Sequence, residues 1–416
     1  MTKPQVNPRT SFVRWQAVVV WAAAAMVALG LLVVLTQFAT MMDLEINLRT
    51  GDRLIEGEQI YDVPDPENGL TFTHTPFAAL LYAAFSLLGS FAAPAWTILS
   101  LIALLRTCYL MVLRMDPWLP REAMSTRTLG LASSLVILTP FISNLRLGQI
   151  SIFILWTAAE AFLSRRPKVG AVLLGIAAAC RLTPLGFIVL LPLINRTREG
   201  VISLATTLGC TLLAFVAVPA PSKEYFQANI VNADRIGGAP EMVSNQSING
   251  LLWRLIGQGG APAVWFVCAT CILLTCWFLG RRSWSQQQQL TAMGVVALGI
   301  LLASPVSWDH HWVIAAPVGC GLFVLATRLR SNSLWALLLI AYLVFLARVI
   351  WLVPHFGGVE FSHSGWQVLA ANSYVIIGLA LIVTVALNAR TGFGQRPPED
   401  KPTLTTSTQQ LGPDHR

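Results

Sequence analysis

Long apolar runs alternate with short polar breaks along almost the whole chain. Several runs are shorter than the ~20 residues that a straight membrane-spanning helix needs, so some must be broken, paired or interfacial. The pattern predicts an all-α polytopic membrane protein in which short broken helices are buried or line a cavity. The runs lie at 15–38, 76–92, 95–113, 128–143, 149–164, 169–180, 184–194, 200–218, 261–280, 288–304, 311–328, 333–352 and 366–388.

Composition supports a membrane protein with one integral domain. The 416 residues are 55% hydrophobic and only 12% charged, about half the charged fraction of soluble domains. The first run is too long for a signal peptide and has no small-residue cleavage site after it, so it is predicted to be an anchor. We expect an integral domain over 15–388 and disordered, cytoplasmic polar tails at 1–14 and 389–416.

Charge distribution orients the predicted helices. With the N-terminal tail inside and 76–92 lying along the outer surface, 12 crossings leave both termini in the cytoplasm. The inside segments then hold 19 of the 28 Lys and Arg but only 6 of the 20 acids. This positive-inside bias is typical of a plasma-membrane protein and explains the net charge of +8 without a nucleic-acid partner. If 76–92 crosses instead, either another crossing changes or the C-terminus lies outside.

The predicted outer loop over 39–75 concentrates acidic residues near the membrane. Most are expected to be solvated, and those from Asp52 to Glu58 fit the polar face of a short helix on the membrane. Asp43 and Glu45 differ because they lie at the membrane edge, where partial desolvation can tune a carboxylate as a base. Asp43 is the predicted catalytic base, with Glu45 as the alternative. The eight carboxylates are Asp43, Glu45, Asp52, Glu56, Glu58, Asp62, Asp65 and Glu67.

Arg181 interrupts the apolar sequence AVLLGIAAACRLTPLGFIVLLPL. A charge at membrane depth costs several kcal/mol on the milder scales, and Thr183-Pro184 should break the helix beside it. We therefore expect a helix–turn–helix at the outer edge, with a cation that can hold a lipid phosphate. The alternatives are an arginine that snorkels to the interface or one paired with a structural carboxylate.

Other polar groups are predicted to reach the same outer side. The amides Gln149, Asn245 and Gln246 suit sugar hydroxyls, and Arg254 suits a phosphate, although helix capping by Asn245 and Ser247 is an alternative. His74 lies at the far end of the acidic loop. Convergence of separate loops on one face predicts an active site at a membrane surface.

The adjacent His310 and His311 can donate to a phosphate, orient a carboxylate or bind a metal. Neighbouring histidines on a helix point in different directions, so a two-ligand metal site is poor geometry and at least one is expected to be structural. The pair Cys268 and Cys271 lies in the middle of an apolar run, where packing is the better interpretation. We expect neither a metal nor a cofactor.

Seven stretches of the chain together resemble glycosyltransferase family 87. They occur in consistent order from Asp43 to His311: an Asp after the first apolar run, G-x-x-IYD, PFAALL, Gly148-Gln149, a basic residue before LTP, NQSINGLLWR and SPVSWDHHW. The chain departs from the usual family pattern at His74-Thr75-Pro76, at Ile150-Ser151 and at Arg181, where lysine is usual. The arginine keeps a phosphate-binding cation, whereas the other departures bear on the identity of sugar and acceptor.

The resemblance implies a type C glycosyltransferase fold and an active site on the extracytoplasmic face. Family members use polyprenyl-phosphate sugars, chiefly mannose, to extend phosphatidylinositol mannosides and lipoglycans, and related members transfer arabinofuranose. The implied reaction is an inverting displacement with Asp43 as base. Arg181, His310 or His311, and Arg254 would bind the donor phosphate; His74, Gln149, Asn245 and Gln246 would bind sugar or lipid-anchored acceptor.

Two other functional classes fit part of the pattern. A lipid-linked sugar transporter or flippase is also polytopic, but transporters more often show paired halves and ionisable residues near the bilayer midplane. A non-catalytic scaffold in cell-wall assembly would not require Arg181 at a broken helix.

Overall fold

The computed structural model describes residues 41–229, 240–257 and 262–388. Throughout these ranges the regular structure is helical, and extended pairing is limited there to an isolated bridge between Asn245 and Trp308. The predicted all-α class is confirmed. The first apolar run at 15–38 and the two predicted tails, 1–14 and 389–416, lie outside the described residues.

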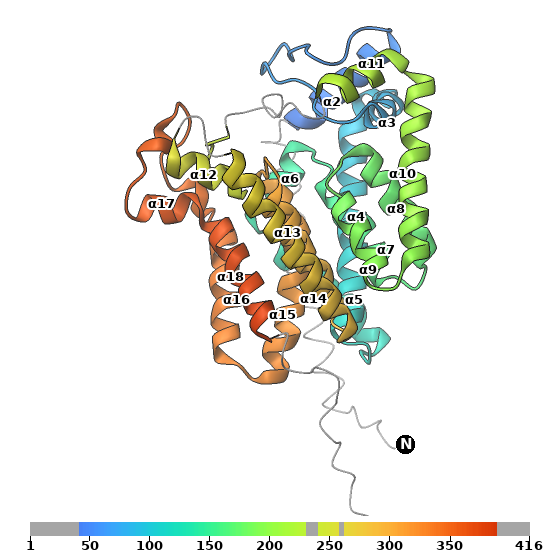
Figure 1. The fold of residues 1–416 in the computed structure, drawn as a ribbon. Helices are drawn as coiled ribbons and strands as arrows, with labels where there is room; N and C mark the ends of the chain where they lie inside the picture. The colour runs from blue at the N-terminus through green and yellow to red at the C-terminus, as the bar shows by residue number, and fades with distance from the viewer. Residues whose placement is uncertain (1–40, 230–239, 258–261, 389–416) are drawn as a thin grey trace, which may run out of the picture.

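The longer helices run side by side and form a bundle (Figure 1). Its large buried cluster is built mainly from leucine, isoleucine, valine, alanine and phenylalanine side chains. The bundle elements are α4 (Ala92–Met115), α5 (Arg121–Val136), α6 (Thr139–Leu147), α7 (Ser151–Leu163), α8 (Pro167–Cys180), α9 (Leu185–Leu193), α10 (Thr197–Ala217), α13 (Pro262–Ser285), α14 (Gln289–Ala303), η4 (Asp309–Ala315), α15 (Ala316–Leu329), α16 (Asn332–Leu346) and α18 (Ser373–Asn388).

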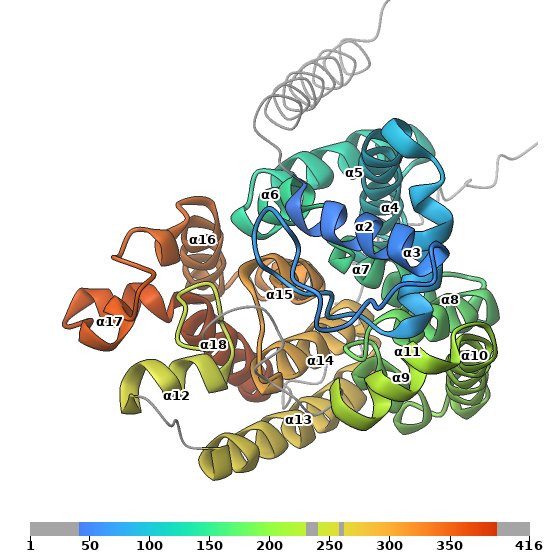
Figure 2. The same cartoon turned by 90° about the horizontal axis from the view of Figure 1, so that it is seen from above.

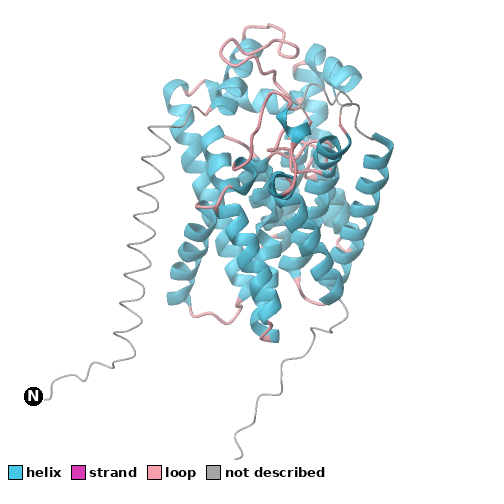
Figure 3. Cartoon of the chain, turned by 90° about the vertical axis from the view of Figure 1, so that its left-hand side faces the viewer, coloured by secondary structure: helices cyan, strands magenta, loops and turns pink. Residues whose placement is uncertain are grey.

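The remaining elements and the longer loops gather toward one end of the bundle (Figures 2 and 3). They form a layer in which polar backbone and side chains from distant parts of the sequence come together. These elements are α2 (Met42–Ile55), α3 (Pro76–Ser86), η1 (Gly89–Phe91), α11 (Pro219–Glu224), η2 (Tyr225–Asn229), α12 (Ile248–Ile256), η5 (Val349–Trp351), η6 (Val359–Ser362) and α17 (Trp366–Ala371).

Several described helices can cross a membrane by length and composition. Large apolar side chains on two of them face outward: Val216 of α10 is 82% exposed and Phe266 of α13 is 66% exposed. Such exposure over long apolar helices fits contact with lipid rather than water. The spans are Gly89–Met115, Thr197–Ala217, Pro262–Ser285 and Asp309–Leu329, with a fifth if the bent pair Arg121–Val136 and Thr139–Leu147 counts as one.

Several apolar runs treated as continuous in the sequence are broken in the structure, and two examples show how. The run at 128–143 divides into α5 and α6, which meet at an angle of 80°. Pro140 stands in the first turn of α6, where its fixed φ and missing N–H favour a helix start. The run at 366–388 divides at Asn372, between α17 and α18. The prediction of 12 crossings counted several runs as full spans, although these runs form apolar helices of only 10–17 residues.

The loop predicted over 39–75 contains a 14-residue helix, α2, which is longer than the short helix expected near Asp52–Glu58. Its apolar face is buried at Leu44 and Ile46. α2 lies tightly against α3, because a Cβ on Gly51 would come within 2.7 Å of the backbone nitrogen of Ala83. This close approach fixes α2 over the end of the bundle.

Candidate active site

A cavity of about 480 Å³ lies beside α2 at the loop-rich end of the bundle. Its lining comes from α2, the loop before α3, α6 and the turn after it, the turn after α8, and the polypeptide at 242–244, 308–310 and 348–351. Segments separated by some 300 residues therefore share one space. The predicted site residues that line it are Asp43, His74, Gln149, Arg181 and His310.

Asp43 stands in the first turn of α2 and is held from the side by α6. The side-chain nitrogen Nε2 of Gln149 donates a hydrogen bond of 2.5 Å to Asp43 Oδ2. Gly148 ends α6 with a φ of 69°, and a Cβ there would lie 2.5 Å from Leu44 Cβ. Glycine is required for both reasons. This turn positions Gln149, and Asp43 Oδ1 accepts no hydrogen bond from the described residues.

Arg181 lies at the break that the sequence predicted, between the end of α8 at Cys180 and the start of α9 at Leu185. Its backbone is extended, with φ −154° and ψ 138°. Thr75 Oγ1 donates to the carbonyl oxygen of Ala179, at 2.5 Å, which ties the loop before α3 to this break. No carboxylate in the described ranges lies within ion-pair distance of Arg181.

The guanidinium of Arg181 contacts the imidazole of His311. Arg181 NH2 is 2.6 Å from His311 Nε2, and the Trp308 backbone nitrogen is 3.1 Å from His311 Nδ1. A guanidinium only donates, so the imidazole is the acceptor in the hydrogen bond at Nε2. His311 therefore holds in place Arg181, which lines the cavity.

His310 faces the cavity with an unused imidazole. Neither of its ring nitrogens has a hydrogen-bond partner among the described residues. Asp309 Oδ1 is 3.6 Å from His310 Nδ1, and Ser143 Oγ donates to Asp309 Oδ2 at 2.8 Å. The cavity thus contains a second buried carboxylate, fixed by α6, beside an imidazole that is available to a ligand.

His74 is buried among aromatic rings, with ring centroids 5.6 Å from Phe72 and 5.9 Å from Tyr82. Burial, and then the charges of Arg181 and His310, lower the pKa of His74 to about 3. The imidazole is therefore neutral near pH 7. A neutral imidazole can donate to or accept from a sugar hydroxyl without adding charge to the cavity.

Glu45 is not part of the cavity lining. It lies one helical turn from Arg49, with 3.5 Å between Glu45 Oε2 and Arg49 NH2, and its side chain is 48% exposed. His311 is also absent from the lining and lies behind Arg181. Its contacts suit support of Arg181 better than direct contact with a ligand.

Asn245, Gln246 and Arg254 are buried and their polar atoms bond within the protein. Gln246 Nε2 donates to the carbonyl oxygens of Val243 and Ala371, each at 2.6 Å. Asn245 Oδ1 accepts from the Ser307 N–H at 3.0 Å. These two residues hold the Ser307–Trp308 stretch in place and do not reach the cavity.

Arg254 is a buried structural cation rather than a cavity residue. Its Nε and NH2 donate to Asn372 Oδ1 at 2.9 and 2.7 Å. Its NH1 donates to the carbonyl oxygens of Met242 and Asn245 at 2.8 and 3.1 Å. This network ties α12 to the junction of α17 and α18, where Asn372 lies.

Sequence reasoning assigned no role to several lining residues. Arg348 interrupts the apolar stretch FLARVIWLV, the same signal that identified Arg181. Ser143 and Asn47 carry no such signal. With Arg146 and Arg348, the lining has three arginines against the carboxylates of Asp43 and Asp309. This excess of positive over negative side chains favours an anionic ligand. No three His, Cys, Asp or Glu side chains in the described ranges lie close enough to hold a metal.

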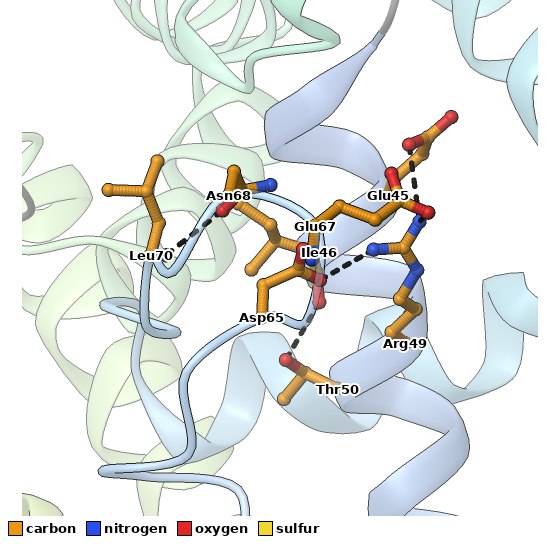
Figure 4. A network of polar contacts seen from close by, with 8 residues as sticks. All are labelled: Glu45, Ile46, Arg49, Thr50, Asp65, Glu67, Asn68 and Leu70. Carbon is orange, nitrogen blue, oxygen red and sulfur yellow. Dashed lines mark hydrogen bonds and ion pairs between the residues drawn. The ribbon is translucent and has the colours of Figure 1, made fainter.

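Arg49 fastens the loop before α3 onto α2 (Figure 4). Its NH1 donates to Asp65 Oδ2 at 2.7 Å and its NH2 to Glu67 Oε1 at 2.6 Å. Burial alone would raise the pKa of Asp65, but the hydrogen bond from Arg49 and two backbone N–H groups outweigh it, so this pKa lies below its ordinary value. The loop continues to Leu70, a cavity residue.

Arg49→Gln is expected to loosen this loop, because it leaves the buried Asp65 carboxylate without its cation. Limited proteolysis between residues 56 and 75 should become at least severalfold faster, with a smaller loss of activity. Acidification has the same effect: the contribution of Asp65 is present above its ordinary pKa and is lost as pH falls through the lower folded value. Arg53→Gln on the same helix is the matched control; equal proteolysis of both variants would contradict the role of Arg49.

The chain is similar to a known family and to named relatives. The profile of glycosyltransferase family 87 matches residues 72–305. A polyprenol-phosphate-mannose-dependent alpha-(1-2)-phosphatidylinositol mannoside mannosyltransferase of Mycolicibacterium smegmatis is 30% identical over 89% of this chain and 90% of its own. The same-named protein of Mycobacterium tuberculosis is 32% identical over 81% of each chain.

A third relative from Mycobacterium tuberculosis is named a polyprenol-phosphate-mannose-dependent alpha-(1-2)-phosphatidylinositol pentamannoside mannosyltransferase. It is 27% identical over 62% of this chain and 60% of its own. No solved structure matches the chain significantly.

Proposed function

The chain belongs to glycosyltransferase family 87, and from this premise we propose that it transfers mannose from a polyprenyl-phosphate donor to a phosphatidylinositol mannoside acceptor. The names of the relatives support both substrates. They favour mannose over the arabinofuranose that some members of the family transfer.

The single observation that carries the proposal is the composition of the cavity. The lining presents the Asp43 carboxylate, held by Gln149, together with the Arg181 guanidinium and the unused imidazole of His310. A transferase needs a base for the acceptor hydroxyl and a cation for the departing phosphate. Both lie within one space of about 480 Å³.

The proposed reaction is a single displacement. Asp43 takes the proton of the acceptor hydroxyl as its oxygen attacks the anomeric carbon, and the bond from that carbon to the phosphate oxygen breaks. Arg181, supported by His311, stabilises the charge that develops on the leaving phosphate, and His310 can donate to it. Attack opposite a β-linked phosphate gives an α-linked product.

An apolar groove of about 520 Å³ supports a lipid-linked donor. It runs between α5, α6, α15 and α16 and includes Pro140, Phe141 and Trp312. Phe141 is two residues before Ser143, and Trp312 is two residues after His310, so α6 and η4 contribute side chains both to the groove and to the cavity. We propose that the prenyl chain of the donor lies in this groove and its phosphate in the cavity.

Gly319→Leu is expected to weaken donor use, because it adds bulk to the groove without a clash inside the protein. A Cβ at Gly319 meets no atom within 4 Å, so the folded structure should tolerate the change. A side chain occupying the space of the prenyl chain should lower kcat/KM for the lipid donor by roughly tenfold. The measurement is the rate of sugar transfer as a function of donor concentration.

Gly209→Leu is the matched control. A Cβ at Gly209 also meets nothing within 4 Å, but Gly209 lies on the exposed surface of α10. Equal effects of the two variants, or an unchanged donor kcat/KM in Gly319→Leu, would show that the groove does not bind the donor.

For the architecture we propose a type C fold with about 12 crossings in the plasma membrane. The positive-inside distribution supports cytoplasmic termini and an extracytoplasmic cavity. The integral domain would cover 15–388, with 39–75 as the catalytic segment and cytoplasmic tails at 1–14 and 389–416.

Membranes with and without the protein can be supplied with radiolabelled polyprenyl-phosphate-mannose or polyprenyl-phosphate-arabinose. Protein-dependent label in a phosphatidylinositol mannoside from the mannose donor is the expected result. Label only from the arabinose donor would show that the transferred sugar is arabinofuranose rather than mannose. Movement of donor across the membrane without product would favour the transporter alternative.

A further inference from the structure

A third hollow, of about 800 Å³, lies at the other end of the bundle from the candidate active site. It is formed by the last half of α4, the start of α5 and the turn between α7 and α8. α4 spans about 36 Å along its axis. Its beginning contacts α3, where Trp96 is 5.7 Å from Tyr82 by ring centroids, whereas its end forms this hollow (Figure 1).

Four arginines from three segments line the hollow: Arg106, Arg121, Arg165 and Arg166. Arg106 is paired, with Nε donating to Glu160 Oε1 at 2.6 Å. The other three have no carboxylate partner among the described residues. No acidic residue belongs to the lining. The hollow therefore carries an uncompensated positive charge, and guanidinium groups bind phosphate oxygens through paired hydrogen bonds.

The same hollow has an apolar wall and an aromatic rim. Leu110, Leu113 and Met124 line it beside the arginines. Tyr109 is also part of the lining, and Arg106 lies over its ring at 5.5 Å. Arg106 is nine residues before the end of α4, so this wall extends about 13 Å into the bundle. A soluble anion would use only the arginines, whereas a phospholipid would use both parts.

We infer that this hollow binds an anionic phospholipid, with its phosphate among Arg121, Arg165 and Arg166 and the upper part of an acyl chain against the leucines. Arginines that merely obey the positive-inside rule need not share a hollow. Arg198 and Arg328 lie at the start of α10 and in the last turn of α15, both exposed and neither part of this lining. Basic pockets between membrane helices commonly hold anionic lipid headgroups.

The test uses the full-length purified protein in detergent and native mass spectrometry. Dioleoylphosphatidylglycerol, dioleoylphosphatidylcholine and pyrophosphate are the three probes. The wild type should retain the anionic lipid over the zwitterionic one, and Arg121→Gln with Arg165→Gln should weaken that binding about tenfold or more. Millimolar pyrophosphate should displace little of the lipid, because it has no apolar part.

Arg198→Gln with Arg328→Gln removes the same charge from the same end and should stay within about twofold of the wild type. Arg121→Lys with Arg165→Lys keeps the charge, tests that the site folds, and should retain part of the binding. An equal loss of lipid binding in both double Gln variants would overturn the inference, because diffuse surface charge would then explain the binding. Complete displacement by pyrophosphate would make the ligand a soluble phosphate. The assay is independent of sugar transfer, so its failure leaves the proposed function untouched.

Discussion

Asp43→Asn is expected to abolish sugar transfer, lowering kcat by roughly 10²–10⁴-fold, the usual contribution of a positioned base. The substitution preserves shape, and the amide oxygen of asparagine can still accept from Gln149. What it removes is the ability to take the proton of the acceptor hydroxyl. Initial rates of transfer from polyprenyl-phosphate-mannose by equal amounts of purified protein provide the measurement.

Glu45→Gln is the control for this prediction. Glu45 is half exposed and paired with Arg49 outside the cavity, so its loss should change the rate by less than about threefold. A larger loss in Glu45→Gln than in Asp43→Asn would transfer the role of base to Glu45.

Arg181→Gln is expected to lower kcat/KM for the lipid donor by about 10²–10³-fold, similar to the loss of a single oxyanion donor elsewhere. Arg181 lines the cavity, contacts His311 and has no carboxylate partner within the described residues. Its charge can therefore stabilise the departing phosphate. Arg181→Lys keeps a cation at a position where the family usually has lysine, and should recover much of the activity. The measurement is kcat/KM for the donor, with the unfolding temperature recorded for each variant.

Arg254→Gln separates a catalytic cation from a structural one. It breaks bonds to Asn372 and to three carbonyl oxygens, so we expect a lower unfolding temperature with donor KM nearly unchanged in the folded fraction. A normal unfolding temperature combined with a raised donor KM would return Arg254 to the donor site. A normal kcat/KM for the donor in Arg181→Gln would exclude Arg181 from the donor site.

The sequence predicted the broken helices best where the break coincides with a charge. Arg181 followed by Thr183 and Pro184 violates the apolar pattern strongly, and the structure ends α8 there. The bend before Pro140 was missed because hydropathy continues across it. Asn372 was missed for another reason: its partner Arg254 is 118 residues away, and only the folded chain brings them together.

The same limit applies to the candidate site. Polarity in an apolar chain shows that a residue needs a partner, but not whether that partner is a ligand or another residue. Asp43, Gln149 and Arg181 line the cavity, whereas Gln246 is satisfied by backbone carbonyls. Arg348 interrupts an apolar run as Arg181 does, and consistent use of that signal would have included it.

The most direct test of inverting transfer at this cavity is the stereochemistry of a defined reaction. Purified protein, β-linked polyprenyl-phosphate-mannose and a phosphatidylinositol mannoside acceptor would be combined, and the anomeric configuration of the new linkage measured by NMR. An α-linked mannosyl product, absent with Asp43→Asn, is the predicted result. A β-linked product, or α-linked product at the wild-type rate from Asp43→Asn, would contradict it.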